Sequence, residues 1–187
     1  MIHEFCRGQK EKTLFMFCGP SYAGKSHWYK EGADKTRPHV VLSTDTWLTE
    51  FAYQKDISYQ EAFERHYEGA VAYLKENLDR AIDLGINVYW DQTNLTVKSR
   101  ARKLEFFPDD WCKKAIVCNL GLETLLWRRQ FCKTYYRRHG VPESEVRRQR
   151  GSFELPTLEE GFDDIFPPWF KFENSLEVSA SGGNLGS

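Results

Sequence analysis

Eight consecutive residues near the amino terminus have the types and spacing of a phosphate-binding loop. They read GPSYAGKS, and they are Gly19, Pro20, Ser21, Tyr22, Ala23, Gly24, Lys25 and Ser26. The stretch matches G-x-x-x-x-G-K-[ST] at every fixed position. Small residues let successive backbone N–H groups surround phosphate oxygens, and a helix beginning here adds partial positive charge. The spacing therefore predicts a cradle for the phosphates of a nucleotide.

The last residues of this loop predict a use for ATP and Mg²⁺. Lys25 is placed to reach the β- and γ-phosphates, and the hydroxyl of Ser26 is placed to hold Mg²⁺. We expect His27 to face the phosphates through its backbone N–H and not through its ring. The alternative is an ordinary glycine turn. An apolar run before the loop and a helical pattern after it favour the phosphate cradle.

The loop alone does not separate kinases from GTPases, motors or transporters. The chain has no NKxD-type guanine motif and no obvious ABC signature, and 187 residues are short for a motor. A small kinase that moves the γ-phosphate of ATP onto an acceptor hydroxyl is the class that remains.

Two aspartates follow predicted strands and suggest the acid groups of such a reaction. Asp45 follows the run HVVL with two residues between, and Asp91 directly follows INVYW. Ligands of open α/β sheets bind beyond the carboxyl ends of the strands. We assign Asp45 to accepting the proton of the acceptor hydroxyl and Asp91 to the metal or its waters. The alternatives are a helix N-cap for Asp45 and a turn residue for Asp91.

The elements that must position these groups alternate along the chain. Short apolar runs predict strands at residues 13–18, 39–42, 86–90, 114–118 and, more weakly, 175–178. Helical patterns cover residues 25–30, 58–84, 96–106 and 122–136. Ser58 and Glu61 fit a capping box at the start of the longest helix. This order predicts an α/β fold, with a parallel sheet of about five strands covered by helices on both faces.

Composition limits the organisation and the partners. The length suits a single domain, which we place at residues 1–178, with residues 179–187 as a flexible tail. The net charge is −1, so any basic site must be local. No apolar run reaches the roughly 20 residues that span a membrane, and the amino terminus lacks a secretory signal. We therefore expect no membrane partner and a cytoplasmic protein. The five cysteines form no CxxC pair, so we expect reduced thiols.

Taken together, these motifs resemble the P-loop kinase domain of the polynucleotide 5′-hydroxyl kinases. The shared pieces are GPSYAGKS, the Asp45 segment, WDQTN and LPTLEEGFDDI, in the family's order over roughly residues 13–165. The resemblance implies a P-loop NTPase fold of the adenylate-kinase-like type. It also implies that Asp45 is the general base and that Asp91, Thr93 and Asn94 are the D-x-T-N positions that bind substrate.

The resemblance has one departure. Bacteriophage-type members carry an arginine three residues after the base, where it contacts the phosphate of the acceptor, and this chain has Leu48 there. The departure leaves the identity of the acceptor open.

A dense basic segment covers residues 128–150, with seven arginines and one lysine against two glutamates. We interpret it as a lid, because guanidinium groups bind phosphate with two hydrogen bonds at once. The family's lid arginines map onto Arg128 and onto Arg137 or Arg138, between which the spacing does not choose. The alternative is a solvated helix face with paired charges. Further basic residues after DQTN suggest an extended positive channel, and they are Lys98, Arg100 and Arg102.

The sequence as a whole predicts an ATP-dependent kinase for a hydroxyl of a nucleic acid, namely the 5′-hydroxyl of a polynucleotide, DNA or RNA. One alternative is a kinase of a hydroxymethylated base in DNA, and another is a nucleoside or small-metabolite kinase. A non-enzymatic ATP- or RNA-binding module is the third alternative. The presence of both Asp45 and the lid arginines favours turnover over that last reading.

Overall fold

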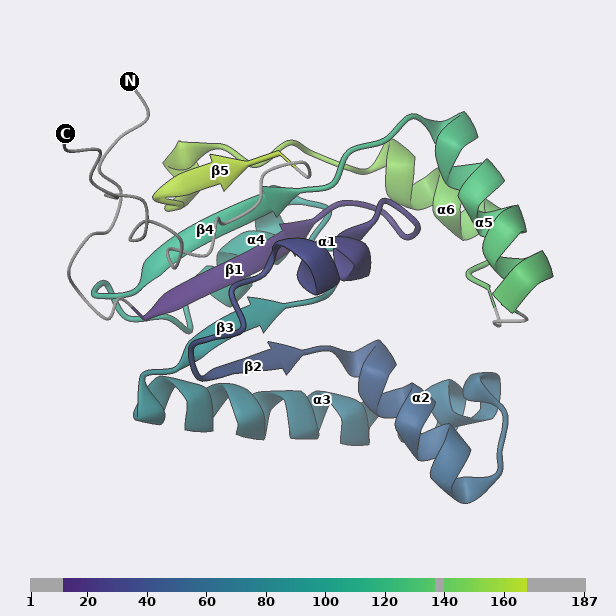
Figure 1. Cartoon of the computed structure of the whole chain (residues 1–187), viewed down its shortest axis with the longest axis horizontal. Helices are drawn as coiled ribbons and strands as arrows, with labels where there is room; N and C mark the ends of the chain where they lie inside the picture. The colour runs from purple at the N-terminus through teal and green to yellow at the C-terminus, as the bar shows by residue number, and fades with distance from the viewer. Residues whose placement is uncertain (1–11, 137–139, 168–187) are drawn as a thin grey trace, which may run out of the picture.

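A five-stranded parallel sheet forms the centre of the protein in a computed structural model that describes residues 12–136 and 140–167 (Figure 1). The strands are β1 (Thr13–Cys18), β2 (His39–Leu42), β3 (Asn87–Trp90), β4 (Cys112–Val117) and β5 (Asp164–Phe166). Their spatial order is β2-β3-β1-β4-β5, and every pair is parallel. The predicted parallel sheet is therefore confirmed, and β1 lies at its centre.

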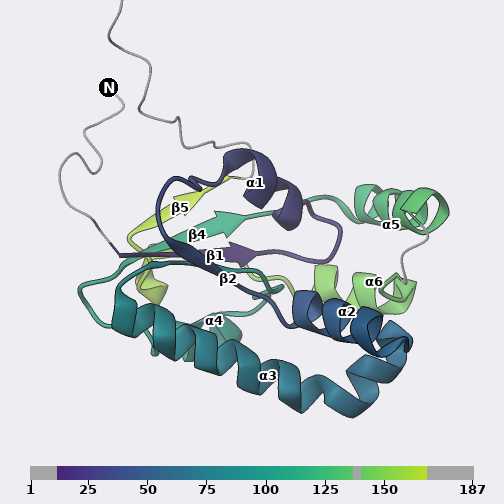
Figure 2. The same cartoon turned by 60° about the horizontal axis from the view of Figure 1, so that its bottom comes forward.

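Helices cover both faces of this sheet, as the alternation of elements predicts (Figure 2). They are α1 (Lys25–Gly32), α2 (Thr44–Lys55), α3 (Tyr59–Leu84), α4 (Val97–Leu104), α5 (Leu122–Tyr136) and α6 (Glu143–Gly151), with a short 3₁₀ helix η1 (Leu158–Glu160). Core residues of α3 and α4 pack on one face, and core residues of α1, α5 and α6 pack on the other.

The central strand β1 is buried on both sides. Leu14 and Met16 belong to the core under α3 and α4, whereas Phe15 and Phe17 belong to the core under α1 and α5. Side chains of a strand point alternately to the two faces, so a strand covered on both faces must be apolar at every position. This explains why the run TLFMFC has no polar alternation.

The helix α3 is the longest helix of the described residues. Its N-cap is Ser58, whose Oγ accepts the N–H of Glu61 at 3.1 Å, which is one of the two bonds of the predicted capping box. The Glu61 carboxylate pairs with Arg65 instead of making the second bond. Its second half packs on the sheet, and its first half runs with α2 past the carboxyl ends of the strands (Figure 1). Although α3 has 26 residues, neither it nor any other helix within the described ranges is apolar enough to cross a membrane.

The fifth strand differs from the prediction. The predicted strand at 175–178 lies outside the described residues, and the fifth strand of the sheet is β5, in the segment GFDDIF. β5 has only three residues and begins with an acid, so it lacks an apolar run. The Lys114 side chain lies 3.8 Å from Asp164 and compensates for that acid.

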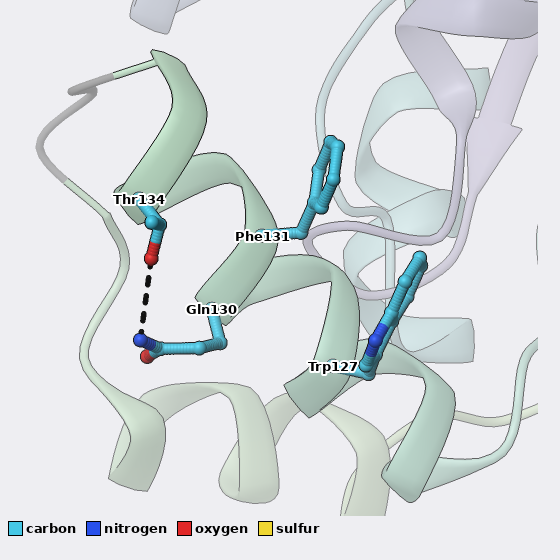
Figure 3. A pocket seen from close by; sticks show the side chains of 4 residues that line it. All are labelled: Trp127, Gln130, Phe131 and Thr134. Carbon is cyan, nitrogen blue, oxygen red and sulfur yellow. Dashed lines mark hydrogen bonds between the residues drawn. The ribbon is translucent and has the colours of Figure 1, made fainter.

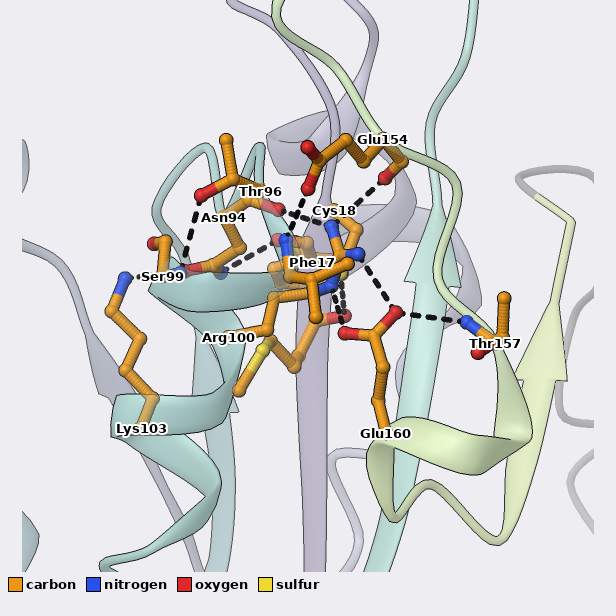
Figure 4. Close-up of polar contacts among 12 residues, drawn as sticks. Phe17, Cys18, Asn94, Thr96, Ser99, Arg100, Lys103, Glu154, Thr157 and Glu160 are labelled. Atoms are coloured by element: carbon orange, nitrogen blue, oxygen red, sulfur yellow. Dashed lines mark hydrogen bonds and ion pairs between the residues drawn. The ribbon is translucent and has the colours of Figure 1, made fainter.

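A buried arginine joins α4 to the segment that follows α6 (Figure 4). Arg100 Nε and Nη2 donate to the two carboxylate oxygens of Glu160 at 2.7 and 2.8 Å. Its Nη1 donates to the carbonyls of Asn94 and Glu154 at 3.1 and 2.9 Å. Arg100 is fully buried. The prediction that Arg100 extends a positive channel is therefore wrong, because its charge is buried and paired with Glu160 inside the domain.

Removal of this guanidinium should destabilise the fold severely. Arg100→Met leaves the Glu160 carboxylate, which is 5% exposed, without its partner. We expect a loss of about 3–5 kcal/mol in the free energy of unfolding, measured by urea titration. The control is Arg65→Met, which breaks the exposed pair with Glu61 and should cost less than about 1 kcal/mol. Equal losses for the two variants would contradict the structural role of Arg100.

Candidate phosphate-transfer site

The loop between β1 and α1 requires glycine at two positions. Gly19 has φ +151°, and a Cβ built on it would lie 2.0 Å from the carbonyl oxygen of Cys118. Gly24 is the N-cap of α1 with φ +105°, and its Cβ would lie 3.3 Å from a guanidinium nitrogen of Arg128. A side chain at either position is strained, so both glycines of the motif follow from backbone geometry. The predicted sequence of strand, loop and helix is present.

Lys25 lies at the mouth of this loop. Its Nζ donates to the carbonyls of Gly19 and Pro20 at 3.1 and 2.8 Å. Burial lowers the pKa of Lys25, and the carboxylates of Asp91 and Asp45 act in the opposite direction. The ammonium is therefore held by loop carbonyls within the field of both predicted acids.

Ser26 and Asp91 supply oxygen ligands at the same place. Ser26 Oγ donates to Asp91 Oδ2 at 3.5 Å. Burial raises the pKa of Asp91, while the charge of Lys25 and the hydrogen bond from Ser26 lower it. A hydroxyl and a carboxylate are hard oxygen ligands of the kind that Mg²⁺ uses together with phosphate oxygens and water. The residues present thus fit the predicted metal.

The D-x-T-N segment after β3 is bound to the end of β1. The carbonyl of Thr93 accepts the N–H of Gly19 at 2.8 Å. Asn94, with φ +45°, donates from Nδ2 to the carbonyl of Phe17 at 2.7 Å. The Asp91 N–H donates to the carbonyl of Leu42, the last residue of β2, at 2.9 Å. In this structure Thr93 and Asn94 hold the segment in place, and their contact with substrate stays a prediction.

A lysine that the sequence analysis did not select supports this segment from below. Lys103 Nζ donates to Gln92 Oε1 at 2.7 Å and lies over the Trp90 ring. It also donates to Asn94 Oδ1 (Figure 4). Burial lowers the pKa of Lys103 to about 8. Nothing in its sequence surroundings, a helix with several basic residues, distinguishes it from its exposed neighbours.

Asp45 lies in the first turn of α2, where its side chain is exposed. The N-cap of that helix is Ser43, whose Oγ accepts the N–H of Thr46 at 3.2 Å. The alternative interpretation of Asp45 as the cap is therefore wrong. Instead, Asp45 Oδ1 accepts a hydrogen bond of 2.8 Å from the hydroxyl of Tyr59 at the start of α3. Sequence reasoning missed Tyr59, because 14 residues separate it from Asp45.

The position three residues after Asp45 faces the interior. Leu48 is fully buried and packs with Ala52, Ala62 and Ala70 between α2 and α3. A side chain at this position is enclosed by the two helices, so it is not available to an acceptor.

Residues of α5, of α6 and of the segment between them form hydrogen bonds with the phosphate loop. Arg128 Nη1 donates to the carbonyl of Tyr22 at 3.3 Å, and the Tyr22 hydroxyl accepts the N–H of Val141 at 2.9 Å. Gln149 Oε1 accepts the N–H of Ser21 at 2.8 Å. Arg128 thus lies beside the phosphate loop, and its predicted role as a lid arginine stays a prediction. The sequence analysis did not select Gln149, which stands among several arginines. His27, next to the loop, has an exposed side chain.

The remaining described arginines of residues 128–150 have partners within the protein. Arg147 pairs with Glu143 and Arg148 pairs with Glu145, both along α6. Arg129 donates to the carbonyl of Val141. For Arg147 and Arg148 the alternative of paired charges on a solvated helix face is therefore right.

Arg137 and Arg138 lie outside the described residues. Their predicted contact with the γ-phosphate stays a prediction.

Two hollows lie near the site. One, of about 450 Å³, is found at the carboxyl ends of β4 and β5, where Val117, Asn119, Phe166 and Pro167 line it. The other, of about 320 Å³, is a surface hollow on α5 beside the stacked rings of Trp127 and Phe131 (Figure 3). The first lies at the edge of the sheet that carries the phosphate loop. The second lies on the solvent-exposed side of α5.

Solved structures share this fold. One is a putative kinase from Chloroflexus aurantiacus, with 15% identity, a TM-score of 0.56 and coverage of 86% of each chain. Another, from the PezAT toxin–antitoxin system of Streptococcus pneumoniae, has 14% identity and a TM-score of 0.58, covering 87% of this chain and 69% of that one. A chain of the Pnkp1/Rnl/Hen1 RNA repair complex has 18% identity and a TM-score of 0.57, covering 92% of this chain and 52% of that one.

The family is shown by the sequence itself. A family model described as an AAA domain, AAA_33, matches residues 14–156. The match runs from β1 through the phosphate loop and both aspartates to the end of α6, and β5 lies beyond it. The chain belongs to the AAA_33 family and has the fold of a P-loop kinase.

Proposed function

We propose that this protein is an ATP-dependent kinase that transfers the γ-phosphate to a hydroxyl of a nucleic acid, namely the 5′-hydroxyl of a polynucleotide. The observation that supports it best is the meeting of Lys25, Ser26 and Asp91 at one edge of the sheet, within the electrostatic reach of Asp45. A phosphate loop with a metal-binding pair needs only an acceptor base to transfer a phosphoryl group.

The chemical step follows from this arrangement. The loop N–H groups and Lys25 hold the β- and γ-phosphates, and Asp45 accepts the proton of the acceptor hydroxyl as its oxygen attacks the γ-phosphorus. The bond from that phosphorus to the bridging oxygen breaks, and ADP leaves. Tyr59 donates to Oδ1 of Asp45, so Oδ2 is the oxygen free to receive the proton. Charge stabilisation by fixed donors supplies most of the acceleration in such reactions.

Ser26, and Asp91 through water, would hold Mg²⁺. The ion would neutralise charge on the phosphates. The hollow at the ends of β4 and β5 has apolar walls and the amide of Asn119, a combination that suits the adenine base.

Two observations favour a polynucleotide as the acceptor. The segment of residues 128–150 concentrates positive charge in a chain whose net charge is −1, and positive clefts attract polyanions. One structural neighbour, Pnkp1, belongs to an RNA repair complex.

The burial of Leu48 supports a second candidate function. Because this position holds a buried leucine, the protein lacks one contact that the resemblance implies bacteriophage-type polynucleotide kinases make to a phosphate of the acceptor. A kinase of a hydroxymethylated base in DNA has no need of that contact.

A transfer screen separates these functions. Radiolabelled γ-phosphate from ATP is offered with 5′-hydroxyl oligonucleotides of DNA and RNA, duplex DNA with hydroxymethylated bases, and free nucleosides. The proposal predicts label on the 5′ ends of oligonucleotides. Label only on modified duplex DNA would favour the second candidate, and label only on nucleosides would remove nucleic acid as the acceptor.

Replacement of the loop lysine should stop turnover without unfolding the protein. In Lys25→Ala the β- and γ-phosphates lose their cation, and we expect kcat to fall by about 10²-fold or more. The fold should survive, because the hydrogen bonds of the Lys25 side chain go to the carbonyls of Gly19 and Pro20, at the start of the same loop. Steady-state phosphate transfer and circular dichroism measure the two quantities. Wild-type turnover in this variant would remove the loop from the mechanism.

Replacement of the proposed base should lower kcat more than it changes KM for ATP. Asp45→Asn keeps the shape of the side chain but removes its basicity, which is typically worth about 10²- to 10⁴-fold. The matched variant Tyr59→Phe keeps the ring and removes only the hydrogen bond to Asp45, so a fall of about 3- to 10-fold is expected. Rapid-quench measurement of the transfer step would show both. An Asp45→Asn protein as fast as the wild type would leave the reaction without this base.

A further inference from the structure

Three aromatic rings form a row along the first half of α3. Tyr59, Phe63 and Tyr67 are four residues apart, so they lie on one face of the helix. The ring centroids of Tyr59 and Phe63 are 6.3 Å apart, and those of Phe63 and Tyr67 are 5.1 Å apart. Phe63 and Tyr67 are each 42% exposed, so part of each ring is open to solvent. We call Tyr59, Phe63 and Tyr67 the aromatic row.

The aromatic row lies on the stripe of α3 that elsewhere packs on the sheet. Further along the same stripe, Leu74 and Leu78 belong to the core beneath β2 and β3. The first half of α3 extends past the carboxyl ends of these strands (Figure 1), so the row continues that stripe beyond the edge of the sheet. This is the edge that carries the phosphate loop and Asp91.

The row begins at the proposed base. The Tyr59 hydroxyl donates to Asp45 Oδ1 at 2.8 Å, so one end of the row is fixed to the carboxylate that would receive the acceptor's proton. An acceptor whose hydroxyl reaches Asp45 can extend from there along Phe63 and Tyr67, which follow Tyr59 on the same face of α3. We propose that the aromatic row binds the first bases of a single-stranded polynucleotide acceptor by stacking. This inference rests on the proposed function and assigns its acceptor-binding surface.

The chemistry of the row suits nucleobases. Every base has a π-face, and stacking on an aromatic side chain is tolerant of sequence. The row itself carries no charge. Of the acids beside it, Glu61 is paired with Arg65, which reduces its repulsion of the acceptor's phosphates. A small sugar or metabolite bound at Asp45 would leave Phe63 and Tyr67 without a role.

The test compares an ordinary oligonucleotide with one that has no bases. Both carry a 5′-hydroxyl and the same phosphates, but the second has abasic sites at its first three nucleotides. The test variant is Phe63→Leu/Tyr67→Leu, which keeps apolar side chains and helix propensity but removes both rings. The control is Tyr73→Leu, an exposed tyrosine of the same helix whose ring faces Trp47 on α2. Circular dichroism confirms the fold of each protein.

The wild type and the control should show an acceptor KM about tenfold or more higher for the abasic oligonucleotide, since each stacked base contributes substantially to binding. In the double variant the KM for the ordinary oligonucleotide should rise to the abasic value, with kcat and the KM for ATP within about twofold. Equal KM values for the two oligonucleotides in the wild type would overturn the aromatic row while leaving the kinase reaction intact. An unchanged base dependence in the double variant would overturn it as well.

Fluorescence anisotropy measures the same comparison without turnover. If no oligonucleotide is phosphorylated but binding depends on bases and on Phe63 and Tyr67, the proposed hydroxyl acceptor is wrong and the aromatic row stands. If neither transfer nor base-dependent binding occurs, both the function and the row are rejected.

Discussion

The hydrogen bond from the Gly19 N–H to the carbonyl of Thr93 fixes the relation between two neighbouring strand ends, and the site depends on it. It joins the phosphate loop after β1 to the acidic segment after β3. The Asn94 side chain strengthens this connection by donating to the carbonyl of Phe17 in β1. The Asp91 N–H donates to the carbonyl of Leu42 and so connects the same segment to β2. Because β1 and β3 are parallel neighbours, the loop and Asp91 emerge at one edge and need only this short bond to be held together.

The opposite charges of Lys25 and Asp91 at that edge each oppose the cost of burying the other. Burial alone would favour neutral forms of both Lys25 and Asp91, and each group's charge moves the pKa of the other back. From the start of α2, Asp45 raises the pKa of both groups, so its charge opposes the effect of burial at Lys25 and adds to that effect at Asp91. A triphosphate adds negative charge to this place, and among the described residues Lys25 and Arg128 lie at the loop to meet it, together with the predicted metal.

The sequence predicts the strand–loop–helix unit, the placement of both aspartates after strands and most of the elements, because these depend on local patterns and on the apolar runs beside them. It does not predict the helices α2 and α6. Asp45 and Asp91 are recognisable since each follows a strand. Contacts between distant segments cannot be predicted from such local patterns. Gln149 accepts a hydrogen bond from Ser21, 128 residues away in the sequence. The sequence around Arg100 is typical of an exposed helical arginine, and its burial depends on the ion pair with Glu160 in the folded protein. β5 is too short and too acidic to show a strand pattern, since its pairing with β4 creates it.

The ion pair between Arg100 and Glu160 also bears on how the protein is made. Sixty residues separate the two partners. At the usual speed of translation, Arg100 is therefore synthesised roughly 3 to 12 seconds before Glu160, the residue with which it pairs. During that time α4 cannot settle against the sheet without burying an unpaired charge. The nascent chain thus holds an open, incompletely packed face next to β1 until the end of the domain leaves the ribosome. Chaperones that recognise exposed apolar strands would meet this protein in that interval.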